Sequence, residues 1–250
     1  MIYSFSSKNR GSKFLDIEFI IEGVQSKEFD IQLPSWRPGR YELANFAKNI
    51  QKFNVKTMNN KPVKFEKISK DRWRIFCGKK KTIKIIYNYY SNELNAGTTW
   101  VDENQIFVNP VNCCFYVVGR ENESIKLNFE KSNHKKTAIG LPKKNGFYVA
   151  DNFDQLADSP FILSNHIQHD SYHLNGVKFN LWFQGECRPP WKKLFKDFKK
   201  FTLEQWKVFG DFPFEEYHFI YQIRPHKAYH GVEHQNNTVI SFGPGHSVFE

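Results

Sequence analysis

The clearest strand pattern in the sequence is FLDIEFII, residues 14–21, in which apolar and polar side chains nearly alternate. A period of two places the apolar side chains on one face of a β-strand. Similar runs follow up to about residue 165, at a spacing of roughly ten residues. They are VKFEKI (63–68), RWRIF (72–76), TIKIIY (82–87), QIFV (105–108), FYVV (115–118), IKLNF (125–129) and FYV (147–149). This spacing predicts an antiparallel β-sandwich or barrel.

Two helices are expected. Residues 41–50 contain Leu43, Phe46, Ala47 and Ile50 at helical spacing. The stronger pattern follows Pro189-Pro190, with apolar residues at i, i+3, i+4 and i+7 and lysines mostly on the other side. Gly210 is a suitable stop signal for this second helix.

The pattern changes after residue 165. Residues 167–174 and 177–183 flank Asn175-Gly176, the pair that favours a type I′ hairpin turn because both residues tolerate positive φ. Further strands are expected at 217–221 and 238–242. The predicted fold class is therefore mainly β or α+β. It comprises an N-terminal antiparallel β-sandwich over residues 1–166 and a second, sheet-plus-helix unit over residues 167–250.

The composition limits the classes of partner. The 250 residues include 36 Lys and Arg against 26 Asp and Glu, a net charge of +10. The lysines occur as scattered doublets without a nucleic-acid motif, which predicts a solvated surface and no nucleic-acid partner. No apolar run approaches a membrane-spanning length, and the first eleven residues lack the apolar core of a signal peptide. With four cysteines and no CxxC pair, these features predict a cytoplasmic protein without a membrane partner.

The histidines offer two groups for metal chemistry. His166, His169 and His173 fall on a predicted strand, where two histidines four apart lie about 13 Å from each other and cannot share a metal. The second group, His230-Gly-Val-Glu233-His234, matches the HxxEH pattern, which needs a helix to bring both histidines to one face. Gly231 and the β-like residues after Asn237 oppose that helix. A self-contained HxxEH metalloenzyme therefore remains the weaker alternative.

Four segments resemble the glycyl aminopeptidase family of zinc metallopeptidases, in the same order. YHGVEHQNNTV (229–239) is similar to the G-G-L-E-H-x-N-S-T segment of that family. LPSWRPGRY (33–41) resembles its L-P-x-W-x-P-G-x-Y motif, and DQLADSP (154–160) resembles Y-D-x-L-x-D-S-P. FGDFPFEEY (209–217) resembles F-G-x-x-P-x-x-x-Y. Together the segments span nearly the whole chain.

The resemblance implies a β-sandwich followed by the start of a thermolysin-like catalytic domain. It implies that Glu233, Gly231 and His234 bind the N-terminus of a peptide substrate, with Glu233 holding the free α-ammonium. A carboxylate paired with an ammonium in a partly dry cleft forms a charge-assisted hydrogen bond. Gly231 would let the ligand approach the backbone closely. The complete family enzyme uses zinc.

One departure from the family is large. The zinc-binding helix carries H-E-x-x-H, and no His-Glu dipeptide occurs in the 250 residues. We therefore expect a chain truncated before that helix, with no catalytic residue, no metal ligand and no bound zinc of its own, and inactive alone. The apolar faces of a truncated second unit would favour self-association. The other alternative is a non-enzymatic module in which the sandwich binds a peptide or protein.

Overall fold

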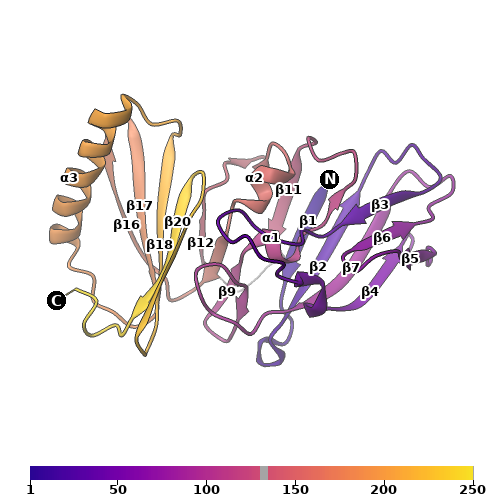
Figure 1. Cartoon of the computed structure of the whole chain (residues 1–250), viewed down its shortest axis with the longest axis horizontal. Helices are drawn as coiled ribbons and strands as arrows, with labels where there is room; N and C mark the ends of the chain where they lie inside the picture. The colour runs from indigo at the N-terminus through magenta and orange to yellow at the C-terminus, as the bar shows by residue number, and fades with distance from the viewer. Residues whose placement is uncertain (130–134, 250) are drawn as a thin grey trace.

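The computed structural model describes residues 1–129 and 135–249, and it arranges them as layered β-sheets with one long helix on the outside (Figure 1). The largest sheet has seven strands in the order β13-β14-β11-β1-β2-β7-β4. Their bounds are β1 (Ile2–Ser6), β2 (Phe14–Ile21), β4 (Ile50–Lys56), β7 (Ile83–Tyr90), β11 (Ile125–Phe129), β13 (Lys143–Lys144) and β14 (Phe147–Ala150).

Two four-stranded sheets accompany the large one. The first has the order β10-β3-β6-β5, with β3 (Phe29–Gln32), β5 (Phe65–Lys67), β6 (Arg72–Ile75) and β10 (Tyr116–Val117). The second has the order β12-β15-β9-β8, with β8 (Trp100–Val101), β9 (Gln105–Val108), β12 (Lys136–Ile139) and β15 (Phe161–Ser164). Side chains of all three sheets meet in one apolar core, which confirms a β-sandwich as the first unit.

The alternation read from the sequence explains this core. In β2 every second side chain is buried, as a strand covered on one face requires. An aromatic cluster fills the space between the sheets, where Phe115 packs edge-on against Trp73 and Tyr87. Two buried tyrosine hydroxyls donate to backbone carbonyls, Tyr3 to Phe115 at 2.7 Å and Tyr87 to Cys113 at 2.6 Å. The core therefore leaves neither hydroxyl without an acceptor.

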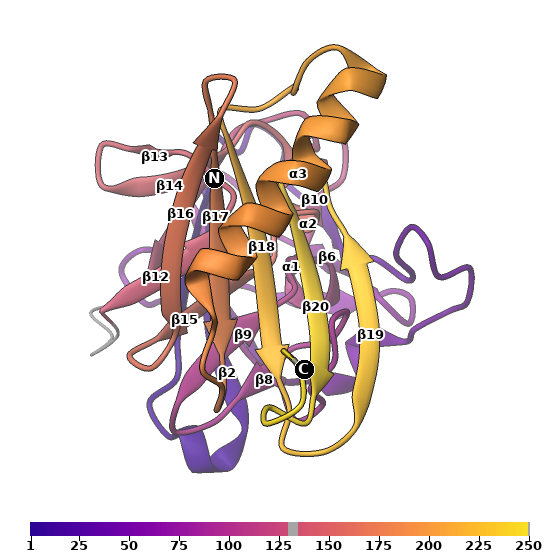
Figure 2. The same ribbon diagram turned by 90° about the vertical axis from the view of Figure 1, so that its left-hand side faces the viewer.

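The fourth sheet has five strands in the order β16-β17-β18-β20-β19, and α3 (Trp191–Phe209) lies diagonally across its outer face (Figure 2). The strands are β16 (Gln168–Leu174), β17 (Val177–Gln184), β18 (Glu216–Ile223), β19 (Ala228–Glu233) and β20 (Asn237–Gly243). Asn175 and Gly176 have φ of 49° and 82°, which confirms the predicted hairpin. The helix is also confirmed, and Gly210 follows it with φ 87°.

The two faces of this sheet have different neighbours. Phe179, Leu181 and Phe183 of β17 belong to the core shared with α3. Trp182, between them in sequence, faces the opposite way and packs with Phe107 and Ile162 of the sandwich. Gln105 and Gln222 exchange two hydrogen bonds across this junction, at 3.1 and 2.8 Å. The second unit is therefore seated on the first through both apolar and polar contacts.

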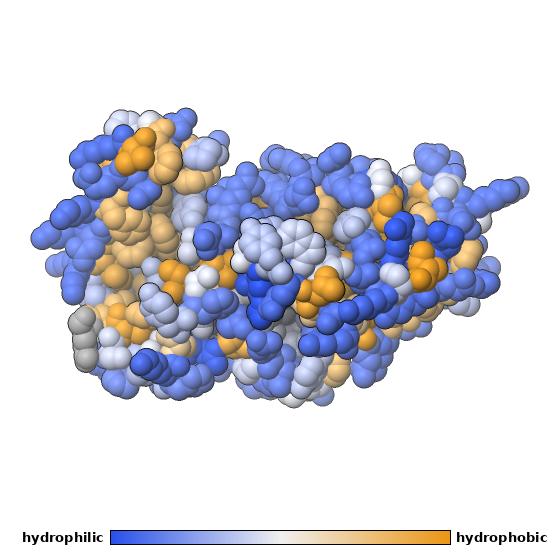
Figure 3. All heavy atoms as spheres, viewed as in Figure 1, coloured by the Kyte–Doolittle hydropathy of each residue, from blue (hydrophilic) through white to orange (hydrophobic). Residues whose placement is uncertain are grey.

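Helix α3 retains exposed apolar side chains. Figure 3 shows apolar surface at the end of the molecule where the helix lies on its sheet. Phe201, Val208 and Phe209 are the exposed large side chains of the helix. The self-association expected from the sequence stays a prediction. Among the described residues, none of the helices combines the length and the apolar run that a bilayer crossing needs.

One detail of the predicted fold is wrong. Residues 41–50 contain only the 3₁₀ turn η2 (Phe46–Asn49), because Asn45 adopts a left-handed conformation and Leu43 is 67% exposed. The mostly antiparallel sheets also include parallel pairs, β1 with β11 and β18 with both β17 and β20. The remaining short helices are η1 (Arg10–Ser12), α1 (Pro110–Cys113) and α2 (Phe153–Ala157).

Candidate functional site

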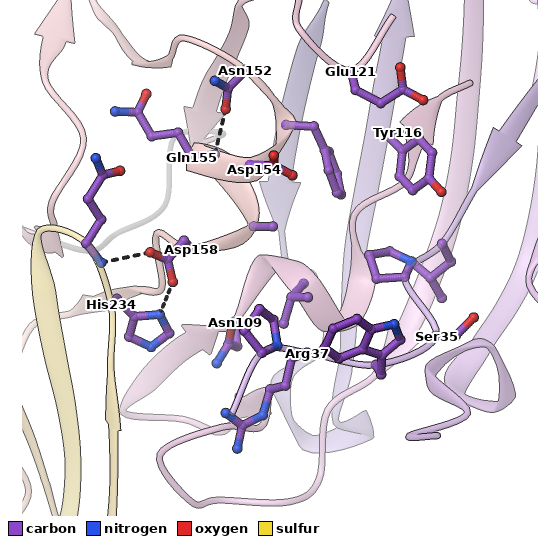
Figure 4. Close-up of a pocket in the computed structure, with 18 of the residues that line it drawn as sticks. Ser35, Arg37, Asn109, Tyr116, Glu121, Asn152, Asp154, Gln155, Asp158 and His234 are labelled. Carbon is purple, nitrogen blue, oxygen red and sulfur yellow. Dashed lines mark hydrogen bonds and ion pairs between the residues drawn. The ribbon is translucent and has the colours of Figure 1, made fainter. Parts of the chain in front are cut away.

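A cleft of about 1350 Å³ lies where the sandwich meets the edge of the five-stranded sheet. Most of its lining comes from three segments that are far apart in sequence. They are the end of β3 with the loop that follows (residues 32–38), the region of α2 (residues 151–158) and the end of β19 with the turn that follows (residues 232–235). Figure 4 shows side chains from these segments around the same space. Three of the four segments quoted for the resemblance therefore reach one cleft, and residues 209–217 do not line it.

Asp158 joins the sandwich to the turn after β19. One carboxylate oxygen accepts from Nδ1 of His234 at 2.7 Å, and the other accepts from the backbone N–H of Gln235, also at 2.7 Å (Figure 4). The His234 side chain is 6% exposed, so this contact is largely shielded from water on the histidine side. Nδ1 is the donor in this contact, and Nε2 of the same ring is buried without a partner among the described residues.

The Asp158→Ala substitution should therefore loosen the turn that follows Glu233. It removes two hydrogen bonds and leaves the buried Nδ1–H of His234 without an acceptor. We expect the free energy of unfolding to fall by about 1–2 kcal/mol. The backbone amide of Gln235 should lose hydrogen-exchange protection. Asp154→Ala is the matched control, since Asp154 lines the same cleft without a contact to this turn. Unchanged protection of Gln235 in Asp158→Ala would contradict the assignment.

Glu233 is the last residue of β19, and β19 is an edge strand that pairs only with β20 among the described residues. Glu233 is exposed and lines the cleft. Gly231, two residues earlier, has open space beside it, since an added Cβ would meet only Ile240 at 4.0 Å. No internal crowding therefore requires a glycine there. The predicted close approach of a ligand at Gly231 stays a prediction.

Arg37 faces Glu233 from the loop wall of the cleft. Burial lowers the pKa of its guanidinium, the charge of Arg40 lowers it further, and the charge of Glu233 partly offsets both effects. His230 lies nearby, and its Nδ1 accepts from the backbone N–H of Ala96 at 3.3 Å. Burial lowers the pKa of His230, and the charges of Arg37 and Arg40 act in the same direction. The neutral form of His230 is therefore favoured.

The HxxEH segment does not form the helix that a metal site would need. His230 and Glu233 belong to strand β19, and His234 follows directly. On an extended backbone the two histidines lie about 13 Å apart, too far to share one zinc ion. Nδ1 of each ring already has a partner from the sandwich, Ala96 for one and Asp158 for the other. Within residues 1–129 and 135–249, no three His, Cys, Asp or Glu side chains are arranged to hold a metal.

Several cleft residues were not singled out by sequence reasoning. Asp158 stood within a quoted motif, but its contact with His234 joins residues 76 positions apart. Arg37 also stood within a motif and was not distinguished from its neighbours. Asn109 is completely buried at the cleft wall, and neither its side-chain nitrogen nor its oxygen has a partner in the described part of the chain. In the sequence Asn109 is distinguished only by the Pro110 that follows it, a pair typical of turns.

Comparisons with known proteins identify the family and the fold. The family described as Peptidase M61 N-terminal domain matches residues 2–165, while a search of curated proteins returned no match. The aminopeptidase N family protein from Idiomarina loihiensis has a TM-score of 0.90 at 24% identity, covering 96% of this chain and 42% of that one. An M1 zinc metallopeptidase from Deinococcus radiodurans has a TM-score of 0.53 at 10% identity, covering 96% and 59%.

A mutant of an M1 zinc metallopeptidase from the same organism, bound to a Tyr-Ser-Ala substrate, gives a TM-score of 0.51 at 11% identity. The match covers 99% of this chain and 60% of that one. The chain therefore spans less than two thirds of the length of these solved structures. At these identities, the likeness establishes the fold.

Proposed function

The chain belongs to the Peptidase M61 N-terminal domain family, and from this premise we propose that it is the front part of a zinc metallo-aminopeptidase. In this proposal residues 1–166 form the sandwich domain and residues 167–250 begin a thermolysin-like catalytic domain. The substrate is a peptide with a free N-terminus. Glu233 binds the α-ammonium, and Gly231 and His234 complete the binding segment.

The observation that carries the proposal is the meeting of three motif segments at one cleft with Glu233 at its wall. A carboxylate there can hold an ammonium by a charge-assisted hydrogen bond, which is stronger than a bond between neutral groups. Asp158 fixes the turn directly after Glu233 and so limits where that carboxylate can lie. An anchor fixed in this way sets the distance from the peptide N-terminus to any reacting group.

The free edge of β19 supports a role in aligning the peptide. An edge strand has unpaired N–H and C=O groups along one side, and an extended peptide can add to them as a further strand. Gly231 lies in the middle of this edge without a side chain to obstruct the approach. Backbone pairing would hold the peptide whatever its sequence, and the anchor would hold its first residue.

Zinc supplies the chemistry of the proposed complete enzyme, because it activates a water molecule for attack on the peptide carbonyl. The described residues of this chain do not fit a zinc site, as the two histidines beside Glu233 lie too far apart on their strand. In this proposal the described residues do not supply the zinc ligands, and the role of this part of the chain is to bind and orient the substrate.

Peptide binding with and without a free amine tests the proposal. Calorimetric titration of the chain at pH 7 with Gly-Ala-NH2 and with its N-acetylated form should show at least a tenfold preference for the free amine. Glu233→Gln should remove this preference, since a neutral amide binds an ammonium less strongly than a carboxylate does. Glu215→Gln, at an exposed residue that does not line the cleft, is the matched control.

Two results would contradict the proposal. One is equal binding of the free and acetylated peptides, which would instead favour the sandwich as a non-enzymatic recognition module. The other is an unchanged amine preference in Glu233→Gln, which would place the anchor elsewhere.

A further inference from the structure

Arg37 lines the same cleft as Glu233. It belongs to the loop that follows β3, and in Figure 4 its side chain extends from that loop toward the side of the cleft where β19 lies. The charge of Glu233 raises the pKa of Arg37, but the two side chains form no ion pair within 4.0 Å among the described residues. Both groups are therefore available to a ligand in the cleft they line.

The guanidinium of Arg37 lacks a close partner. In the described part of the chain it makes no hydrogen bond and no ion pair, although it is partly buried. Arg72 and Arg74, by contrast, both bond the carboxylate of Asp30. A guanidinium without a protein acceptor can form a charge-assisted hydrogen bond when an anion binds. Arg37 therefore has the character of a binding group.

The position of the guanidinium is built into the fold. It lies directly on Gly97, where an added Cβ would come within 2.6 Å of Nη2 and 2.9 Å of Cζ. The turn at Gly97 is itself fixed, because its N–H donates to the side chain of Asn95 at 2.8 Å and its carbonyl accepts from Asn112 at 3.1 Å. Only a glycine leaves room for the guanidinium at this place.

Binding of a peptide amine changes the charge around Arg37. Before binding, Glu233 is the anion whose charge acts on Arg37, while the neighbouring Arg40 is paired with Glu42. Once Glu233 holds an α-ammonium, Arg37 faces a neutralised carboxylate and a new positive charge. His230 favours its neutral form and supplies no compensating charge. A peptide that also brings a carboxylate, a few bonds from its amine, would restore the balance.

We propose that Arg37 binds a carboxylate of the peptide, so that the cleft prefers peptides whose first residue is acidic. This inference rests on the proposed function, since it places the α-amine at Glu233. The side-chain carboxylate of a first-position Asp or Glu lies close to the α-amine in every rotamer. Arg37 then acts as the specificity-determining residue, with the planar fork of the guanidinium receiving the two carboxylate oxygens.

The experiment compares amidated dipeptides by calorimetric titration of the chain. Glu-Ala-NH2 should bind about tenfold more tightly than Gln-Ala-NH2, an effect of one charge-assisted contact. Arg37→Gln should remove this preference while leaving the preference for a free amine in place. The third ligand is Gln-Ala with a free C-terminal carboxylate. It shows whether Arg37 binds the C-terminal carboxylate of a peptide or the side-chain carboxylate of its first residue.

Two further variants test whether Arg37 contacts the carboxylate of the ligand directly or only adds positive charge to the cleft. Arg40→Gln removes an equal charge from the same loop, but Arg40 is exposed and paired with Glu42, so the acidic preference should persist. Gly97→Ala retains Arg37 but displaces its guanidinium, and it should also reduce the preference. Because the displaced group is the far end of a flexible side chain, the fold should tolerate this change.

The outcomes are distinct. Equal binding of Glu-Ala-NH2 and Gln-Ala-NH2, with the amine preference intact, overturns the inference and leaves the proposed function standing. If Gln-Ala with a free C-terminal carboxylate binds more tightly than Gln-Ala-NH2 but Glu-Ala-NH2 does not, the proposed preference for an acidic first residue is wrong. Loss of the preference in Arg40→Gln as strongly as in Arg37→Gln overturns the direct contact. If no free-amine peptide binds better than its acetylated form, both the proposed function and the inference fail.

Discussion

Replacing Phe115 with alanine should lower the free energy of unfolding by about 4 kcal/mol, as measured by urea denaturation. Phe115 is completely buried between the sheets of the sandwich. Its ring lies 5.0 Å from that of Trp73 and 5.2 Å from that of Tyr87, both in edge-to-face geometry. Deleting the ring loses these contacts and leaves a cavity that the surrounding strands cannot easily fill.

The control for this substitution is Phe201→Ala on α3. The same atoms are removed there, but the side chain is 40% exposed, so we expect a loss of about 1 kcal/mol. A loss below 1 kcal/mol for Phe115→Ala would mean that the ring does not join the two sheets. The backbone carbonyl that accepts from Tyr3 is retained in the variant, so the result reports on the ring alone.

Acidification from pH 7 to pH 4.5 should destabilise the protein through His218, by about 2 kcal/mol. Burial lowers the pKa of His218 to about 4, and the opposing charge of Glu216 only partly compensates. The unfolded chain binds a proton at His218 below about pH 6.5, whereas the folded protein does not until about pH 4. Above pH 6.5, His218 therefore does not reduce the free energy of unfolding. As the pH falls from 6.5 toward 4, protonation of the unfolded chain at His218 lowers this free energy.

The His218→Asn variant isolates this effect. Its side-chain oxygen can still accept from Nε1 of Trp182, as Nδ1 of His218 does at 3.1 Å, but it does not titrate. The difference in unfolding free energy between pH 7 and pH 4.5 should be smaller in the variant than in the parent protein. Carboxylates and His169 titrate in both proteins, so their contributions cancel in the comparison. Equal pH dependence in the two proteins would contradict the prediction.

Features set by neighbouring residues could be predicted from the sequence. The turn at Asn175-Gly176 needs two residues that tolerate positive φ, and the apolar stripe of α3 needs only a helical period. The absence of a helix at 230–234 could also be expected, because Gly231 and the residues after Asn237 disfavour one. Local propensity and periodicity are sufficient in such cases.

Features that depend on distant partners could not be predicted. Nothing near Ile2–Ser6 indicates that this strand pairs in parallel with Ile125–Phe129. The helix expected at 41–50 failed for a related reason. Its apolar spacing suggested a buried face, but Leu43 points to solvent and the loop lines the cleft instead. Periodicity in a short segment does not reveal which surface will cover it.

The segments that form the site could be predicted from the sequence, but the residues that hold these segments in place could not. The resemblance drew attention to Glu233 and to the loop at 33–41, which the structure brings to one cleft. The partners that fix those segments are distant in sequence, such as Asp158 for His234 and Gly97 for Arg37. Their role in positioning the site follows from tertiary contacts, which cannot be derived from a single sequence.

The walls of the cleft come from both halves of the chain, and this has a thermodynamic consequence. A ligand that touches both walls binds only while the two halves are docked, so its binding energy is linked to the whole folded assembly. Saturating peptide should raise the melting temperature of the sandwich and of the five-stranded sheet together. Binding of a peptide in the cleft is thus coupled to the docking of the two halves of the chain.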